Sequence, residues 1–142
     1  MDSLVSTEWL AAGLGAPDLR LLDASFFLPS DRREARAEFE KSHIPGARFM
    51  DLAGLADADD PVPGMLPPEY KFASRMQALG VGDGDRILVY DHSPHHSAAR
   101  GWWMLRSFGA QQVAILDGGM AKWKAEGGPL EAGPSAIGQV RE

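Results

Sequence analysis

The sequence contains no cysteine. This absence excludes disulfide bonds, thiolate metal sites and a cysteine nucleophile within these residues. The chain also lacks any apolar run that approaches the about 20 residues needed to cross a bilayer, and it begins without the basic and apolar segments of a secretory signal. We therefore expect no membrane partner and a cytoplasmic location.

Basic charge is scarce as well, with 14 Lys and Arg residues against 20 Asp and Glu residues and a formal net charge of -6. Proteins that bind nucleic acid neutralise rows of phosphates with clustered Lys and Arg side chains, and no such cluster occurs in this sequence. The composition therefore predicts that nucleic acid is not a partner.

The remaining composition is that of an ordinary globular domain. Of the 142 residues, 44% are hydrophobic and 24% are charged, and a chain of this length suits one domain. After residue 128 the sequence turns to Ala, Gly, Pro and Ser with few large apolar residues, which is typical of a linker. We predict a domain over residues 1–128 and a linker, or the start of an interdomain connector, over residues 129–142.

Short apolar stretches alternate with helix-forming segments along the chain. The expected strands are residues 19–25, 47–52, 86–90 and 113–116. The expected helices are residues 7–14, 33–41, 68–79, 98–108 and 120–126, with a Gly- and Pro-rich loop over residues 53–68. Residues 86–90, RILVY, are the strongest strand and should be central. This alternation predicts a parallel sheet covered by helices on both faces.

The loop after the expected central strand is the candidate functional segment. Ligands and reactive groups of open parallel sheets gather at the carboxyl ends of the strands, beside helix N-termini. This loop carries Asp91, His92, His95 and His96, which form a cluster with metal-ligand chemistry. A flexible loop gives no fixed tetrahedral set of ligands, so we expect solvated histidines and no metal site.

Arg100 falls in the first turn of the helix expected after this loop, where the helix dipole disfavours a cation. It either pairs with an acid of this domain or contacts the cleft, and both alternatives stay open. The neighbouring Trp102 and Trp103 point about 100° apart on a helix, so they should not be buried equally. An exposed indole would favour contact with another domain or self-association.

Several short motifs occur in an order that resembles a known family. They are LLDAS at residues 21–25, AEFE at 37–40, HIPGA at 43–47, MLP at 65–67, VYD at 89–91, Ser97, Ala98 and Arg100, WW at 102–103, LDGG at 116–119, and Trp123. In this order and spacing they resemble the N-terminal domain of the thiosulfate and 3-mercaptopyruvate sulfurtransferases. The resemblance implies an α/β rhodanese-like fold, with a central parallel sheet of about five strands and helices on both faces.

The resemblance also assigns roles to the candidate loop. Active rhodanese domains begin this loop with a cysteine, whose thiolate and persulfide are stabilised by backbone N–H groups and a helix dipole. Asp91 stands at that position. It is either a fixed anion that fills the cradle formed by these N–H groups, or a group with a direct acid/base role. Arg100, His92, His95 and His96 would then lie on the substrate side of a cleft.

By the same resemblance, the working cysteine lies in a second rhodanese domain and the substrate cleft lies between the two domains. This chain would be the non-catalytic domain of an enzyme that passes sulfane sulfur from a small sulfur donor to a thiol or cyanide, without a cofactor. The mercaptopyruvate enzymes carry an acid and a histidine where this sequence has Ala53 and Gly64, which favours thiosulfate or another sulfane donor. The rival interpretation is a free-standing rhodanese-like module that binds a partner or a small anion and has no enzymatic activity.

Overall fold

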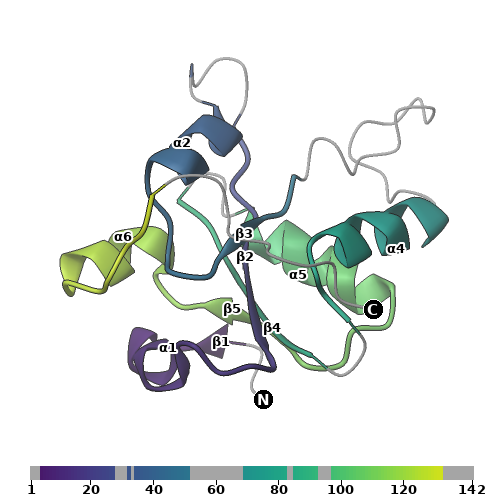
Figure 1. Cartoon of the computed structure of the whole chain (residues 1–142), viewed down its shortest axis with the longest axis horizontal. Helices are drawn as coiled ribbons and strands as arrows, with labels where there is room; N and C mark the ends of the chain where they lie inside the picture. The colour runs from purple at the N-terminus through teal and green to yellow at the C-terminus, as the bar shows by residue number, and fades with distance from the viewer. Residues whose placement is uncertain are drawn as a thin grey trace.

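The computed structural model describes residues 4–27, 32, 34–51, 69–82, 85–92 and 97–132. Five strands form one sheet, and every pair of neighbouring strands is parallel. The strands are β1 (Leu4–Val5), β2 (Leu19–Asp23), β3 (Arg48–Phe49), β4 (Arg86–Tyr90) and β5 (Val113–Leu116), in the spatial order β1-β5-β4-β2-β3. The predicted parallel sheet is confirmed, and β4 lies at its centre (Figure 1).

Helices cover both faces of this sheet, as expected. They are α1 (Thr7–Gly13), α2 (Ala35–Lys41), α4 (Glu69–Ala78), α5 (Ala98–Ser107) and α6 (Gly119–Ala125). Buried side chains of α1, α2 and α6 join one hydrophobic core, and those of α4 and α5 join a second core. No helix among the described residues is long and apolar enough to span a bilayer.

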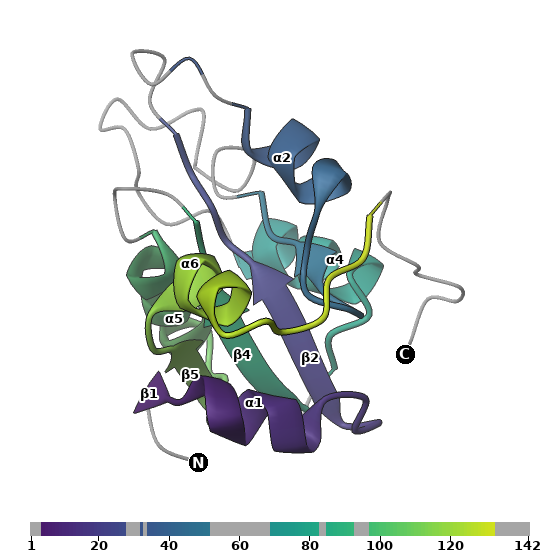
Figure 2. The same cartoon turned by 90° about the vertical axis from the view of Figure 1, so that its left-hand side faces the viewer.

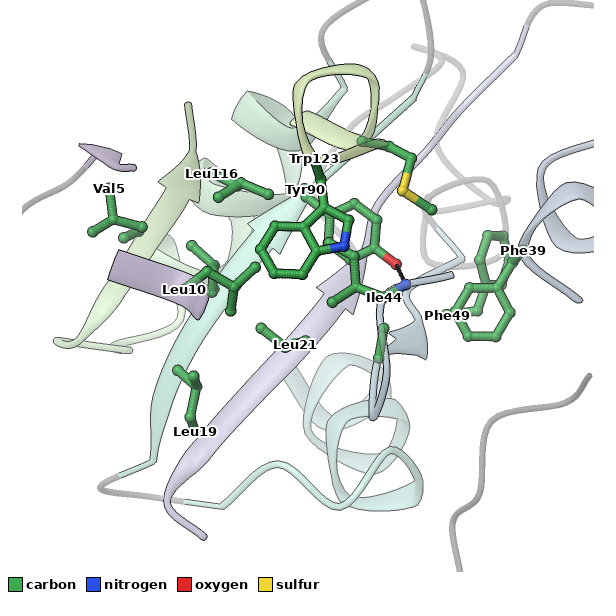
Figure 3. Close-up of a cluster of buried hydrophobic side chains, with 14 residues drawn as sticks. Val5, Leu10, Leu19, Leu21, Phe39, Ile44, Phe49, Tyr90, Leu116 and Trp123 are labelled. Atoms are coloured by element: carbon green, nitrogen blue, oxygen red, sulfur yellow. Dashed lines mark hydrogen bonds between the residues drawn. The ribbon is translucent and has the colours of Figure 1, made fainter. Parts of the chain in front are cut away.

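The central strand β4 separates the two cores. Leu88 and Tyr90 belong to the core under α1, α2 and α6, whereas Ile87 and Val89 belong to the core under α4 and α5. Alternation along a strand that is buried on both faces explains why its sequence is a continuous apolar run. Figure 3 shows Tyr90 at the middle of the first core, close to Trp123 of α6.

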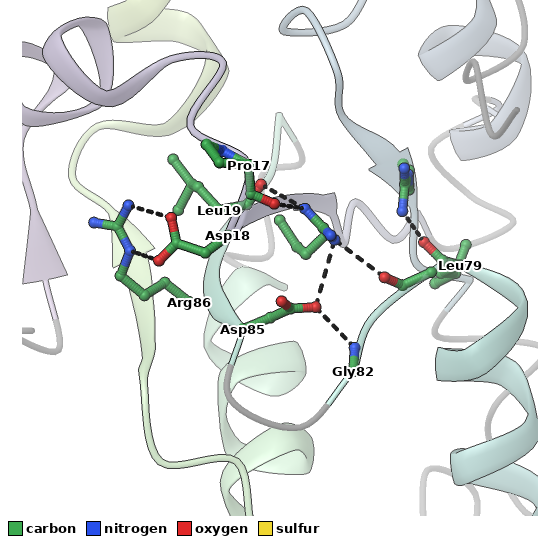
Figure 4. A network of polar contacts seen from close by, with 10 residues as sticks. Pro17, Asp18, Leu19, Leu79, Gly82, Asp85 and Arg86 are labelled. Atoms are coloured by element: carbon green, nitrogen blue, oxygen red, sulfur yellow. Dashed lines mark hydrogen bonds and ion pairs between the residues drawn. The ribbon is translucent and has the colours of Figure 1, made fainter. Parts of the chain in front are cut away.

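Polar contacts fasten the opposite, amino end of the sheet (Figure 4). The buried Arg20 of β2 donates its Nε–H to the carbonyl of Gly80 at 3.0 Å and lies 3.4 Å from a carboxylate oxygen of Asp85. Arg86 of β4 makes two hydrogen bonds to the Asp18 carboxylate, at 2.7 and 3.0 Å. These contacts lie at the amino ends of β2 and β4, at the opposite edge of the sheet from the carboxyl ends.

The predicted boundaries hold best for the buried strands. Residues 86–90 and 113–116 are strands as expected, whereas the strand expected over 47–52 contains only Arg48–Phe49. The edge strand Leu4–Val5 was not predicted, because two residues show no periodicity and its pairing with β5 is a tertiary contact. The expected loop over 53–68 lies outside the described residues.

The described part of the expected linker lies against the domain. Glu131 pairs with His43 in an antiparallel bridge, and the indole Nε1–H of Trp123 donates to the carbonyl of Pro129 at 2.8 Å. Composition alone did not indicate these contacts, because they depend on side chains far away in the sequence. The boundary at residue 128 stays a prediction.

Candidate functional site

A cleft of about 870 Å³ opens at the carboxyl edge of the sheet, where the sequence predicted the functional segment. Its walls come from α2, the start of the loop after β4, the first turn of α5, and the turn and helix after β5. The ionisable and imidazole side chains in its lining are Glu38, Asp91, His92, Asp117 and Lys124. Because three of these five are carboxylates, the cleft has an acidic lining.

Asp91 directly follows β4, and its side chain faces the first turn of α5. Its carboxylate oxygen Oδ2 accepts a hydrogen bond from the backbone N–H of Ala98, the first residue of α5, at 2.7 Å. The first N–H groups of a helix have no partner within the helix, and the positive end of the helix dipole favours an anion there. This is the contact expected of a fixed anion, and the acid/base role stays a hypothesis.

The first turn of a second helix, α6, contacts the backbone of Asp91. The N–H of Met120, in the first turn of α6, donates to the carbonyl oxygen of Asp91 at 2.9 Å. A Cβ on Gly119 would lie 2.6 Å from that oxygen, and Gly119 has a φ of 59°. Only glycine therefore permits this close approach. From the sequence, the LDGG motif indicated only the family resemblance, and its contact with Asp91 was missed.

His92 is held between two carboxylates. Its Nε2 lies 3.5 Å from Oδ2 of Asp23, and its Nδ1 lies 3.4 Å from Oε1 of Glu38. Its backbone N–H donates to the hydroxyl of Ser25 at 3.0 Å, and its side chain is only 15% exposed. The expectation of a solvated histidine is therefore wrong for His92, because the end of β2 and helix α2 enclose it.

The other two histidines of the loop, His95 and His96, lie outside the described residues. Within the part of the chain that the structure describes, no three His, Asp or Glu side chains are arranged to hold a metal ion.

Asp23, which contacts His92, and Tyr90 are buried at the carboxyl ends of β2 and β4. They pair across β2 and β4, and each is fully buried. The phenol oxygen of Tyr90 accepts the N–H of Ile44 at 3.3 Å. Burial, reinforced by the charge of Asp23, raises the pKa of Tyr90 well above its usual range, so the phenol stays neutral. From the sequence, Asp23 stood out only as part of the LLDAS motif, so its place beside His92 was missed.

Both alternatives for Arg100, an acid partner in this domain or contact with an interdomain cleft, stay predictions. Its guanidinium lies over the ring of Trp103, 4.8 Å from the ring centre, and it is not part of the described cleft lining. Trp102 packs against the second core and donates its Nε1–H to the carbonyl of Val113 at 3.1 Å. Trp103 is 43% exposed, so the prediction that the two indoles differ in burial is confirmed.

Together these features define a class of protein: a parallel α/β domain in which a carboxylate, here that of Asp91, lies between the carboxyl edge of the sheet and the N-terminus of a helix. Comparison with known proteins narrows this class. Residues 6–126 match the model of the rhodanese-like domain. The chain belongs to the rhodanese-like domain family.

The similar proteins are sulfurtransferases. The chain is 45% identical over 139 residues to human 3-mercaptopyruvate sulfurtransferase, covering 94% of this chain and 47% of the relative. It is 44% identical over 134 residues to the mitochondrial thiosulfate/3-mercaptopyruvate sulfurtransferase 1 of Arabidopsis thaliana, covering 94% of this chain and 35% of that protein. The chain spans only about a third to a half of the length of these relatives.

Solved structures give the same result. The crystal structure of SseA from Escherichia coli, a 3-mercaptopyruvate enzyme, superposes with a TM-score of 0.88 at 39% identity, and the match covers 94% of this chain and 52% of that chain. The structure of Tum1 from Saccharomyces cerevisiae matches with a TM-score of 0.85 at 27% identity, over 98% of this chain and 47% of that chain. The rhodanese-like fold is therefore confirmed.

The raised pKa of Tyr90 predicts how stability depends on alkaline pH. A tyrosine ionises near pH 10 when unfolded, so the folded state loses about 1.4 kcal/mol per pH unit above that pH until the folded-state pKa is reached. We expect Tyr90→Phe to flatten this decline while lowering stability at neutral pH by about 1–3 kcal/mol, because the N–H of Ile44 loses its acceptor. Urea unfolding measured from about pH 8 to about pH 11 tests this expectation.

The matched control is Tyr70→Phe, since Tyr70 is 79% exposed. It should leave both the neutral stability and the alkaline slope unchanged. An unchanged alkaline slope in Tyr90→Phe would contradict the assignment.

Proposed function

We propose that this chain is the non-catalytic N-terminal rhodanese domain of a tandem sulfurtransferase, in which a cysteine of a second domain carries the sulfur. The observation that carries the proposal is the contact between the Asp91 carboxylate and the N–H of Ala98. By the family resemblance, the reactive cysteine of an active domain stands at this position. The sequence has no cysteine, and the chain spans about half of its human relative.

The chemistry of sulfur transfer explains why a carboxylate cannot replace the cysteine. A thiolate attacks the sulfane sulfur of thiosulfate, a new S–S bond forms, and the S–S bond to the sulfite group breaks with sulfite leaving. The sulfur then passes from the persulfide to a thiol or to cyanide. The carboxylate of Asp91 is a poor nucleophile toward sulfur, and its negative charge repels an anionic donor from the helix N-terminus.

The donor is proposed to be thiosulfate or another sulfane donor, with 3-mercaptopyruvate as the alternative. The names of the relatives include both substrates. The positions that favour thiosulfate, Ala53 and Gly64, lie outside the described residues, so the argument for that donor is from sequence. A cytoplasmic location likewise stays a prediction.

The proposed partner is the second rhodanese domain, on the surface of α5 that carries Trp103. This indole is 43% exposed, and the guanidinium of Arg100 covers one face of its ring. An aromatic ring with a stacked arginine is the kind of anchor that protein interfaces use. In the absence of the second domain, the same surface would support self-association.

The alternative function is a free-standing rhodanese-like module that binds a partner and transfers no sulfur. The cleft of about 870 Å³ favours it, because residues of this domain alone form the described lining. A second HxPG turn and a cysteine loop encoded downstream in the same reading frame would decide for the tandem enzyme.

The first test is enzymatic. We expect the chain by itself to show no thiosulfate:cyanide and no mercaptopyruvate:thiol transfer above the uncatalysed rate, because no side chain here can hold a persulfide. Cyanide- and thiol-dependent turnover should be measured on protein shown by mass spectrometry to be free of other sulfurtransferases. Turnover proportional to the concentration of this chain would overturn the proposal.

Restoring a thiol tests the loop itself. We expect Asp91→Cys to form a persulfide at least about a hundredfold more slowly than an intact rhodanese loop, because stabilising the anion requires several aligned N–H donors and Pro94 supplies none. A one-sulfur gain in intact mass after thiosulfate treatment reports the reaction. Asp91→Ser is the control and should gain no sulfur, and rapid, complete persulfide formation in Asp91→Cys would show that the cradle is intact.

The proposed partner surface has its own test. We expect Trp103→Ala to weaken association with a separately supplied second domain by about 10-fold or more, since a buried aromatic anchor contributes upwards of 1 kcal/mol. Tyr70→Ala, which removes another exposed aromatic ring, is the control. Titration calorimetry measures both, and equal affinity for the two variants would place the interface elsewhere.

A further inference from the structure

Residues 128–132 form a strap that crosses back over the first core after α6. Figure 2 shows the yellow segment after α6 lying in front of the sheet on its way toward the chain between α2 and β3. Its start is pressed against an indole, because a Cβ on Gly128 would lie 2.3 Å from a ring atom of Trp123. The carbonyl of Pro129 accepts the N–H of that indole.

The far end of the strap is fastened to the HIPG turn. The backbone groups of His43 and Glu131 exchange two hydrogen bonds, each of 2.8 Å. The side chain of Glu131 adds two contacts from one oxygen: Oε1 accepts the N–H of Gly46 at 2.9 Å and lies 3.0 Å from Nε2 of His43. Three of the four contacts therefore involve His43.

The imidazole of His43 is enclosed on all sides. The residue is fully buried, and its ring stacks on the ring of Phe39 with the centres 4.1 Å apart. Its Nδ1 lies 2.8 Å from the carbonyl oxygen of Phe39. A carbonyl and an ionised carboxylate only accept hydrogen bonds, so both ring nitrogens face acceptors. The ring satisfies both only as an imidazolium, which carries a proton on each nitrogen.

We propose that residues 128–132 are a proton-dependent latch, closed when His43 carries both ring protons and open when it has lost one. When the proton on Nε2 leaves to solvent, a lone pair of the ring faces the carboxylate of Glu131, and the contact becomes repulsive. The closed state thus binds one proton more than the open state. By linkage, opening becomes more favourable as the pH rises.

The other charged groups near the ring do not replace this pair. The phenol of Tyr90, which accepts the N–H of the residue after His43, stays neutral because burial raises its pKa. On α2, Glu38 contacts the imidazole of His92 in the cleft, and Glu40 and Lys41 are exposed. Among the described residues, Glu131 is therefore the charged group that pairs with the ring.

The latch does not depend on the proposed function, since every contact lies within this chain. In the proposed tandem protein its consequence would be to fix the point at which the connector leaves the first domain. Opening would then loosen the connection between the two domains without disturbing the sheet.

Amide hydrogen exchange and ¹⁵N resonances of the His43 ring, both measured by NMR on this chain, test the latch. Between about pH 5.5 and about pH 8.5, the protection of the Glu131 amide should fall by up to about tenfold per pH unit after correction for intrinsic exchange. At the lower pH both ring nitrogens should be protonated. The amide of Leu88 in β4 should keep its protection, which separates latch opening from global unfolding.

Glu131→Gln removes the charge while keeping the shape. One atom of a glutamine cannot both accept from Gly46 and donate to a neutral ring, so protection at residue 131 should drop about tenfold or more at pH 6 and lose its dependence on pH. Glu40→Gln makes the same change at an exposed position of α2 and should match the unmodified chain. A His43 ring with one unprotonated nitrogen while the Glu131 amide is protected, or protection independent of pH in the unmodified chain, would overturn the latch.

Discussion

The burial of β4 on both faces is the constraint on which the rest of the structure depends. Each face of this strand supports a separate core, so its position and register cannot change without disrupting both. Its carboxyl end consequently places Asp91 at a defined point. There α5 presents the N–H of Ala98 to the side chain of Asp91, and α6 presents the N–H of Met120 to its backbone carbonyl. The cleft lies where the first turns of two helices contact Asp91, the residue directly after β4.

An anion at this point serves folding and catalysis differently. The helix N-terminus requires a negative charge or another acceptor, and the carboxylate of Asp91 supplies it as well as a thiolate would. Sulfur transfer requires in addition a polarisable atom that can form and break S–S bonds, which a carboxylate lacks. In the proposed function, an aspartate at the cysteine position keeps the electrostatic role and removes the chemical one. This is consistent with a domain that keeps the rhodanese fold while a partner domain performs the reaction.

The sequence predicted correctly the elements that local patterns specify. Residues 86–90 and 113–116 were recognised as strands because buried strands are short, apolar and bounded by turn residues. The failures involve contacts between distant residues: the pairing of Leu4–Val5 with β5, the enclosure of His92 by Asp23 and Glu38, and the docking of Glu131 on His43.

By itself the sequence determined the fold class, the family and the absence of a reactive thiol, because these follow from periodicity, from ordered motifs and from residue identity. Only the tertiary structure decided which side chains meet. His92 and His43 each have a proline two positions later in the sequence, and nothing local distinguishes a solvated imidazole from a buried one. Their environments come from β2, α2 and the strap after α6, which are separated from them by up to 88 positions in the chain. Burial and charge pairing are properties of that three-dimensional packing, so they appear only once the sheet has brought those segments together.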